Sequence, residues 1–370
     1  MKILIFSAFY HPHIGGYEKN VHELAKRLVQ RGHQVSVLTC NTEDAEPLEL
    51  VDDVMVIRVP SWNLLSGTYP VPKPSLELLN TLRAIDTDVV ITQTRFFLTS
   101  LFGLVMAKRR NIPLVHVERG TCHSYSDSSV VRRLAEMYDH TIGSLIVKQA
   151  TRVVGVSKSV DKFVEHLGRK DTRVIYNGIE NGVTRQKHNS TVIIFVGRLV
   201  YSKGVRDLME AFEATHKLHD NVKLFIVGDG NYREQLEKTR SRLRCKDSVI
   251  FYGERSQRQV MDLLSVSDIF VNPSYSEGLP TCVLEAASMG LPIVATDVGG
   301  TKEIIRNGVS GIIIKPNDSF QIHLAIEYYL RHPVEAKAMG ISAKTMLGHK
   351  FGWDRIVSQY EKLLGEVING

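Results

Sequence analysis

Two glutamates, Glu277 and Glu285, lie on either side of a predicted helix start. The apolar strand pattern of Asp268–Asn272 leads into the loop that carries Glu277. Leu279-Pro280 marks the first turn of the helix, because proline is tolerated there, and Gly290 ends it. A helix N-terminus attracts anions, and ionised carboxylates accept hydrogen bonds from hydroxyl groups. The stretch therefore suits a ligand with phosphates and a polyol, although carboxylates at helix ends can also be simple caps.

Two cations follow another predicted strand. Arg198 comes directly after Gly197, and Lys203 lies five residues further on. Open α/β sheets bind ligands beyond the carboxyl ends of their strands, so this pair is well placed to neutralise a diphosphate. An exposed, purely structural pair is the alternative for this motif alone.

Two glycine turns follow strands as well. Gly15-Gly16 stands between the first strand and the first helix, where the lack of a Cβ allows close approach of a ligand. Gly228-Asp229-Gly230 resembles part of a dinucleotide fingerprint, but the third glycine is missing. Each turn can equally be a tight strand connection without a ligand.

Alternating strand and helix patterns run through the whole chain and predict doubly wound parallel sheets. A polar stretch without periodicity, Asn177–Ser190, predicts a linker between two domains, residues 1–180 and residues 190–350. We expect Ser61–Ser75, which carries three prolines, to be a loop. The expected strands begin at Met1, Val35, Val54, Asp88, Leu114, Arg152 and Arg173 in the first domain, and at Val192, Val222, Val249, Asp268, Pro292 and Ser310 in the second.

Composition indicates a soluble globular protein. Of the 370 residues, 43% are hydrophobic and 23% are charged, and the formal net charge is +6. Four scattered cysteines suit a reducing compartment, and no apolar run reaches the roughly 18–20 residues that span a bilayer, so we expect a cytoplasmic protein. The basic groups Lys108–Arg110 and Arg132-Arg133 suggest peripheral membrane association, with helix capping as the plainer alternative. No recognition helix or basic stripe with interleaved aromatic residues indicates nucleic-acid binding.

Taken together, these motifs resemble glycosyltransferase family four, whose retaining enzymes have the GT-B fold. Glu277 and Glu285 match its Glu-x7-Glu motif, and Gly299-Gly300 before Glu303 matches a further segment. The resemblance covers nearly the whole chain. It implies an α/β protein with two doubly wound Rossmann-like domains facing a cleft, and a C-terminal helix, residues 351–370, that packs back on the first domain.

The resemblance also implies roles for individual residues. Arg198 and Lys203 would stabilise the leaving diphosphate, Glu277 would accept hydrogen bonds from the donor sugar, and Glu285 would accept from the ribose. The loop and turn residues that would contact the donor are Gly15, Gly16, Gly197, Gly228, Gly230, Gly278, Leu279, Pro280 and Thr281. One position departs from the family pattern, which has His-Gly where this chain has Arg119-Gly120. Either Arg119 supplies a permanent charge near the sugar, or His123 takes the histidine's place.

We therefore expect a metal-independent, retaining hexosyl- or N-acetylhexosaminyltransferase that needs no cofactor. Its donor would be a UDP-sugar and its acceptor a glycan or a lipid-linked molecule of cell-surface polysaccharide or glycolipid synthesis. The metal-free expectation rests on reading no Asp-x-Asp and no His/Asp cluster with ligand spacing in the chain. A GDP-sugar mannosyl- or fucosyltransferase is the alternative, followed by a nucleotide-sugar epimerase and a homologue that only binds its ligand.

Overall fold

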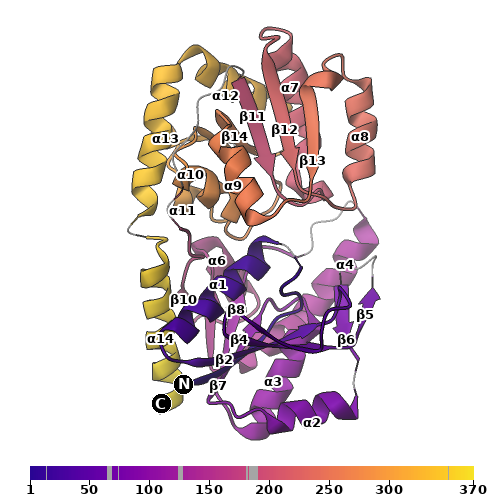
Figure 1. The fold of residues 1–370 in the computed structure, drawn as a ribbon, viewed down its shortest axis with the longest axis vertical. Coiled ribbons are helices and arrows are strands. Elements are labelled where there is room, and N and C mark those ends of the chain that lie inside the picture. The colour runs from indigo at the N-terminus through magenta and orange to yellow at the C-terminus, as the bar shows by residue number, and fades with distance from the viewer. Residues whose placement is uncertain are drawn as a thin grey trace. The chain divides into compact units, whose positions relative to one another are not determined.

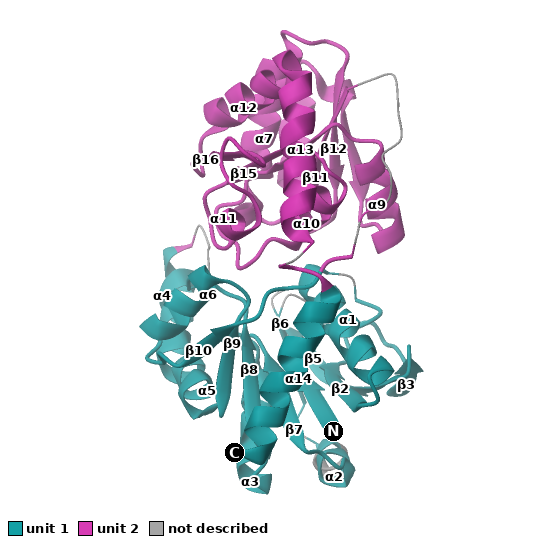
Figure 2. Ribbon diagram, turned by 90° about the vertical axis from the view of Figure 1, so that its left-hand side faces the viewer, with its two compact units in different colours: residues 1–124, 129–178, 353–370 teal, residues 125–128, 179–352 magenta. Residues whose placement is uncertain are grey.

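The computed structural model describes residues 1–13, 15–64, 69–73, 75–123, 128–180, 182, 191–348 and 350–370 (Figure 1). The chain forms two compact units (Figure 2). Unit 1 comprises residues 1–124, 129–178 and 353–370, and unit 2 comprises residues 125–128 and 179–352. Most of the expected linker, Asn177–Ser190, lies outside the described residues.

Unit 1 is built on a sheet whose strand order is β10-β9-β8-β7-β1-β2-β4-β3. Every described pair is parallel except β3 with β4. Its elements are β1 (Lys2–Phe6), α1 (Gly16–Gln30), β2 (Gln34–Cys40), β3 (Leu48–Val51), β4 (Val54–Val59), β5 (Ser61–Leu64), β6 (Tyr69–Pro72), α2 (Leu76–Ala84), β7 (Val89–Gln93), α3 (Leu98–Arg110), β8 (Leu114–Glu118), α4 (Ser129–Tyr138), the π-helical turn η1 (Asp139–Gly143), α5 (Ser144–Gln149), β9 (Arg152–Gly155), α6 (Lys158–His166), β10 (Thr172–Val174) and α14 (Trp353–Asn369).

The central strands of unit 1 are buried and mostly apolar because helices cover both faces of the sheet. β1, β7 and β8 are almost fully buried. The strand order reverses between β1 and β7, which lie side by side although the chain between them visits one half of the sheet. In such sheets this reversal is where ligands bind.

The last helix, α14, belongs to unit 1. It buries one stripe with helical spacing, formed by Trp353, Ile356, Val357, Tyr360, Leu363, Leu364 and Val367. The Trp353 ring lies against Gly178, where a Cβ would come within 2.3 Å of it, and Arg27 of α1 stacks over the ring at 4.9 Å. Glu361 adds hydrogen bonds to Arg31 and His33 at 2.6 and 3.0 Å.

Unit 2 has a parallel sheet of order β13-β12-β11-β14-β15-β16, which reverses between β11 and β14. This is the Rossmann order 3-2-1-4-5-6. Its elements are β11 (Thr191–Val196), the 3₁₀ turn η2 (Tyr201–Lys203), α7 (Val205–His216), β12 (Val222–Val227), α8 (Arg233–Arg242), the 3₁₀ turn η3 (Lys246–Ser248), β13 (Val249–Gly253), α9 (Gln257–Ser265), β14 (Ile269–Asn272), α10 (Thr281–Ser288), β15 (Ile293–Thr296), α11 (Thr301–Ile304), β16 (Ile312–Ile314), α12 (Ser319–Arg331) and α13 (Pro333–Leu347).

The expected fold class, α/β with two doubly wound Rossmann-like domains, is confirmed by these sheets. The loop predicted at Ser61–Ser75 is wrong for the residues described there, because β5 and β6 pair antiparallel from Ser61↔Pro72 to Leu64↔Tyr69. Prolines are tolerated in this two-stranded ribbon since both of its strands are edges. The Tyr69 hydroxyl also ties β6 to the Phe96 carbonyl oxygen at 2.8 Å.

Within the part of the chain that the structure describes, no helix is both long and apolar enough to cross a membrane.

Candidate active site

In unit 2 the predicted site residues gather where the strand order reverses. Arg198 and Lys203 follow β11, and Glu277 follows β14, the strand that pairs with β11 through Ile193↔Ile269. Since parallel strands end at the same edge, the two loops meet there. The Tyr275 amide donates to the Ser202 carbonyl oxygen at 2.7 Å, which joins the loops directly.

Lys203 and Glu277 form an ion pair between these loops. Lys203 Nζ lies 2.7 Å from Glu277 Oε1, and the Ser274 hydroxyl donates to the same oxygen at 2.7 Å. The Glu277 side chain is only 9% exposed and that of Lys203 18% exposed. Arg198 is exposed, and its guanidinium makes no hydrogen bond or ion pair with any residue that the structure describes. The site thus combines one fixed charge pair with one cation available to a ligand.

Two glycines allow the backbone contacts that fix this pair. A Cβ on Gly204, directly after Lys203, would meet the Pro273 carbonyl oxygen at 2.1 Å. A Cβ on Gly299 would lie 2.0 Å from the Glu277 carbonyl oxygen. The next residue, Gly300, donates its amide to the Gly278 carbonyl oxygen at 2.8 Å. Only glycine fits these positions, since both also have positive φ, at 64° and 54°.

The turn after β12 packs against the turn after β11. A Cβ on Gly228 would lie 2.0 Å from the Gly197 carbonyl oxygen, and one on Gly230 would lie 2.4 Å from that of Leu199. The Leu199 amide donates to the Asp229 carbonyl oxygen at 2.8 Å. The close packing of the two turns therefore explains both glycines without a ligand, and their donor-binding role stays a prediction.

The helix expected after Pro280 is α10, which starts at Thr281 and is followed by Gly290 at φ 70°. Leu279 is buried, so its side chain belongs to the core. Glu285 is also buried and accepts a hydrogen bond from Gln257 of α9 at 3.1 Å. Beside the two glutamates, burial raises the pKa of the Cys282 thiol to about 12. This thiol is therefore no candidate nucleophile.

In unit 1 the structure places Arg119 beside the first strand's loop. Its Nη1 donates to Asn177 Oδ1 at 2.8 Å, and its Nε and Nη2 donate to Gln93 Oε1 at 3.2 and 3.1 Å. The guanidinium also lies over the Tyr17 ring at 5.7 Å. Burial lowers the pKa of the Arg119 guanidinium, but arginine stays charged at such values. The result is a fixed positive charge beside Tyr17, the residue that follows Gly15-Gly16.

His123 lies in a different environment from Arg119. Its Nδ1 is 2.7 Å from Asp139 Oδ2, and its ring packs against Phe163 with centroids 5.2 Å apart. The two side chains thus have different partners, and Arg119 as the residue at the family's histidine position stays a prediction.

The N-terminus of α1 is covered by a carboxylate. A Cβ on Gly15 would lie 2.1 Å from Glu18 Oε2, so the Glu18 side chain folds over this glycine. A phosphate placed there would meet a like charge. The structure thus supports close packing as the reason for Gly15, and donor binding by Gly15 and Gly16 stays a prediction.

A buried acid orients the segment of Arg119. Glu118 Oε1 accepts from the Arg119 and Gly120 amides, both at 2.7 Å, and lies 2.9 Å from Arg95 Nη1. Burial alone would raise the pKa of the Glu118 carboxyl, but the Arg95 charge and hydrogen bonds from His116 and Gly120 outweigh it. Its pKa therefore lies well below the usual range. This carboxylate holds the loop and is not positioned as a proton donor.

Sequence reasoning missed several groups. Gln93 and Asn177 hold Arg119, although polar residues at strand ends could have drawn attention to Gln93. The expectation that the chain has no Asp-x-Asp is wrong, because Asp86-Thr87-Asp88 is one; Asp88, however, accepts from the Lys2 amide at 2.6 Å, and Asp86 pairs with Lys2 Nζ. This motif stands at the start of β7, the edge of the sheet opposite the site. It does not serve as a metal site next to the motifs above.

Comparison with known proteins agrees with this architecture. Residues 14–181 match the model of Glycosyltransferase Family 4, and residues 179–346 match that of Glycosyl transferases group 1. An uncharacterized glycosyltransferase of Methanocaldococcus jannaschii is 31% identical over 100% of this chain and 99% of its own length. Alpha-monoglucosyldiacylglycerol synthase of Streptococcus pneumoniae is 25% identical, covering 97% of this chain and 87% of its own. The solved structure of HepE of Anabaena in complex with UDP-glucose superposes with a TM-score of 0.80 at 20% identity, covering 99% and 100% of the two chains.

The chain belongs to glycosyltransferase family 4 and is a glycosyltransferase of the GT-B fold.

Proposed function

We propose that the protein transfers a hexose or N-acetylhexosamine from a UDP-sugar, with retention of configuration, to a glycan or a lipid-linked acceptor. The observation that carries this proposal is the Lys203–Glu277 pair beside Arg198, at the strand reversal of unit 2. Together with Arg198, the pair offers what a nucleotide sugar requires, namely two cations for its diphosphate and an acceptor carboxylate for its sugar hydroxyls.

In this proposal Arg198 and Lys203 contact the diphosphate and stabilise the charge that develops on it as the sugar leaves. Preorganised charges of this kind are worth a few kcal/mol each. Glu277 accepts hydrogen bonds from the sugar, and Glu285 accepts from the ribose. The backbone from Gly278 to Thr281 borders sugar and phosphate. No metal or cofactor takes part, because the two cations do the work that a divalent ion does in other transferases.

We infer that the leaving phosphate takes the proton of the acceptor hydroxyl, so that the new bond forms on the face from which the old one breaks. Arg119 of unit 1 supplies a fixed positive charge near the sugar. Its bonds to Gln93 and Asn177 support this role, because they hold the guanidinium in one position. The choice of UDP is supported by HepE, whose structure contains UDP-glucose.

A lipid-linked acceptor is supported by the surface of α4. This helix exposes Val130, Val131, Leu134 and Met137 together with Arg132 and Arg133. An exposed apolar stripe with basic flanks suits an anionic membrane surface. The relative from Streptococcus pneumoniae bears the name of a glycolipid synthase. In the other basic group, Lys108–Arg110, Arg110 donates to the Leu82 and Ile85 carbonyl oxygens at the end of α3, so this arginine has a structural role.

The test is thermal stabilisation of the purified protein by UDP, GDP, ADP and their sugars, with and without EDTA, each against ligand-free protein in the same buffer. A ligand that binds only the folded protein raises the unfolding midpoint. We expect a shift with UDP compounds that EDTA does not change. A shift confined to GDP compounds would replace the donor by a GDP-sugar, and no shift with any nucleotide would contradict the proposed site.

Transfer itself is tested with the UDP-sugar that gives the largest shift, by following UDP release in the presence of anionic lipid vesicles that contain diacylglycerol. Arg198→Ala should abolish UDP release while the protein stays folded. Unaltered transfer by that variant would contradict the assignment of Arg198.

A further inference from the structure

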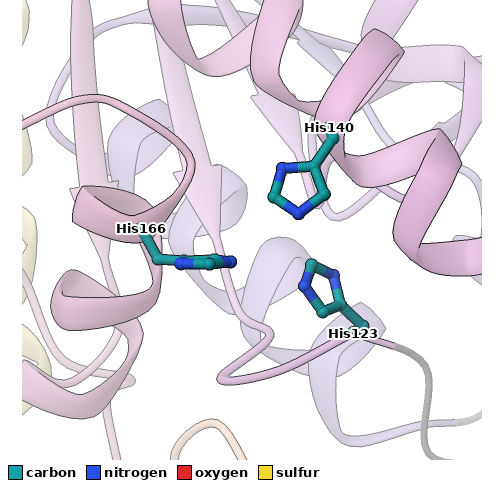
Figure 3. Close-up of side chains that lie close together, drawn as sticks. All are labelled: His123, His140 and His166. Atoms are coloured by element: carbon teal, nitrogen blue, oxygen red, sulfur yellow. The ribbon is translucent and has the colours of Figure 1, made fainter.

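Three histidines of unit 1, distant in sequence, bring their rings together (Figure 3). His123 lies in the loop after β8, His140 in η1, and His166 is the last residue of α6. One ring nitrogen from each lies within 4.8 Å of the other two. The ring centroids are 5.2 to 5.6 Å apart, and the rings are turned toward a common space.

One of these rings is held by a buried carboxylate. His123 Nδ1 lies 2.7 Å from Asp139 Oδ2, and Asp139 is 1% exposed. Asp139 is fixed in turn by Arg95, whose Nε and Nη2 donate to its two oxygens at 2.8 and 2.9 Å. A carboxylate that accepts from Nδ1 keeps the proton on that atom and leaves Nε2 as a lone-pair donor. Metal-binding histidines have this kind of support.

The local charge favours a cation. Arg95, the buried cation that holds Asp139, is balanced by two buried carboxylates, Asp139 at 2.8 Å and Glu118 at 2.9 Å. The three groups together carry one negative charge. The Phe163 ring borders His123 and His166 and stacks on Arg95 at 4.4 Å, which limits water on that side.

The ring nitrogens of His140 and His166 remain available. Neither makes a hydrogen bond with any residue in the described part of the chain. Both residues are exposed at the surface, so their rings can turn without disturbing the core. A tetrahedral Zn²⁺ site with Zn–N distances of about 2.1 Å needs nitrogens roughly 3.4 Å apart. The ring nitrogens therefore have to approach one another by at most roughly 1.4 Å, a movement within the reach of a side-chain rotation.

We propose that His123, His140 and His166 form a three-histidine site for a divalent transition metal of the class that prefers imidazole, with Zn²⁺ as the representative ion. A fourth position stays open to water. The metal joins the loop after β8, the turn η1 and the end of α6, three segments that already meet through the contacts of His123 with Asp139 and Phe163. The metal cross-links segments of unit 1 and takes no part in the donor chemistry proposed for unit 2.

Cobalt substitution tests this site without any activity assay. Untagged full-length protein is freed of metal by a chelator and titrated with Co²⁺. Bound Co²⁺ absorbs visible light strongly when few ligands surround it, so the absorption reports binding at the proposed site. We expect saturation at one equivalent and loss of the absorption when Zn²⁺ is added. Zn²⁺ should also raise the unfolding midpoint of the metal-free protein.

Matched variants locate the site. His140→Ala and His166→Ala should each weaken Co²⁺ binding by more than about 100-fold, and Asp139→Asn should weaken it by about 10- to 100-fold. His332→Ala, an exposed histidine of unit 2, should leave it unchanged. His140 and His166 are exposed, so their variants should keep the circular dichroism spectrum of the parent. The proposal is overturned if folded protein shows no cobalt absorption at one equivalent, or if both histidine variants bind Co²⁺ as the parent does.

Discussion

Lys203 and Glu277 form an ion pair at 2.7 Å between the loops that follow β11 and β14. Each loop leaves its strand next to the other, because these two strands are neighbours at the point where the order of the sheet reverses. The topology of the sheet thus positions one charge, on Lys203, and one hydrogen-bond acceptor, on Glu277.

Replacing either member of this pair should weaken donor binding. Lys203→Ala and Glu277→Ala should each lower the affinity for UDP-sugar by about 10- to 100-fold, the usual cost of a lost hydrogen bond to a charged group. The double variant should lose less than the product of the two, since each single change already breaks the pair. Calorimetric titration measures all three. Lys238→Ala, an exposed lysine of α8, is the control and should bind as the parent does.

A methyl group on Gly299 should disturb the site more than one on a comparable glycine. Gly299→Ala places a Cβ 2.0 Å from the Glu277 carbonyl oxygen, so the Glu277 loop has to move, and we expect at least a tenfold loss of donor affinity. Gly308 has a similar φ, 71°, but no atom within 4 Å of its Cβ position. Gly308→Ala should cost only about 1 kcal/mol of stability and leave donor affinity unchanged. Equal affinities for the two variants would show that the Gly299 contact does not position Glu277.

The buried Glu118 should make unit 1 sensitive to acid. Its pKa is lowered in the folded protein, so its stabilising contribution is present above the unfolded value of about 4.3 and disappears as the pH falls below it. Glu118→Gln should therefore reduce the free energy of unfolding by about 3–5 kcal/mol at pH 7 and by clearly less near pH 3.

Denaturant titrations at both pH values measure this difference. Asp86→Asn is the control, because Asp86 pairs with Lys2 at the exposed surface and its loss should be barely measurable. A deficit in Glu118→Gln that does not change between pH 7 and pH 3 would argue against a charge effect.

The chain has two tryptophans, and they should differ strongly in their effect on stability. Trp353 is buried under α1 and Gly178, whereas Trp62 on β5 is 49% exposed. Trp353→Leu should reduce the free energy of unfolding by about 2–4 kcal/mol, because it leaves a cavity. Trp62→Leu should change it by less than about 0.5 kcal/mol. Differential scanning calorimetry checks both, and comparable losses would mean that α14 contributes little to unit 1.

Much of the fold followed from the sequence because buried parallel strands are continuous apolar runs. Strands β8 (Leu114–Glu118) and β12 (Val222–Val227) begin at the predicted residues, Leu114 and Val222. The prolines predict a loop where the hairpin β5–β6 lies. The pairing of these two strands depends on their edge position and on contacts with Tyr69. Short strands at the margin of a sheet, such as β3, lack a buried face and so carry no such signal.

The site could be predicted only in part. The rule that ligands bind beyond strand ends points to Arg198 and Lys203, and the family resemblance adds Glu277, but neither predicts the Lys203–Glu277 ion pair. The sequence does not reveal Gln93 and Asn177 as partners of Arg119, because they come from separate segments and Asn177 lies in the expected linker. The three histidines are also joined only by the tertiary fold, since no spacing along the chain marks them as a group.

The return of α14 to unit 1 has a consequence for how the protein is made. During synthesis, residues 353–370 leave the ribosome after the whole of unit 2. The place on unit 1 where Trp353 packs therefore stays unfilled while some 170 residues emerge. Unit 2, by contrast, is nearly contiguous in sequence and can form as soon as it is free. The first half of the chain to appear is therefore the last to be finished.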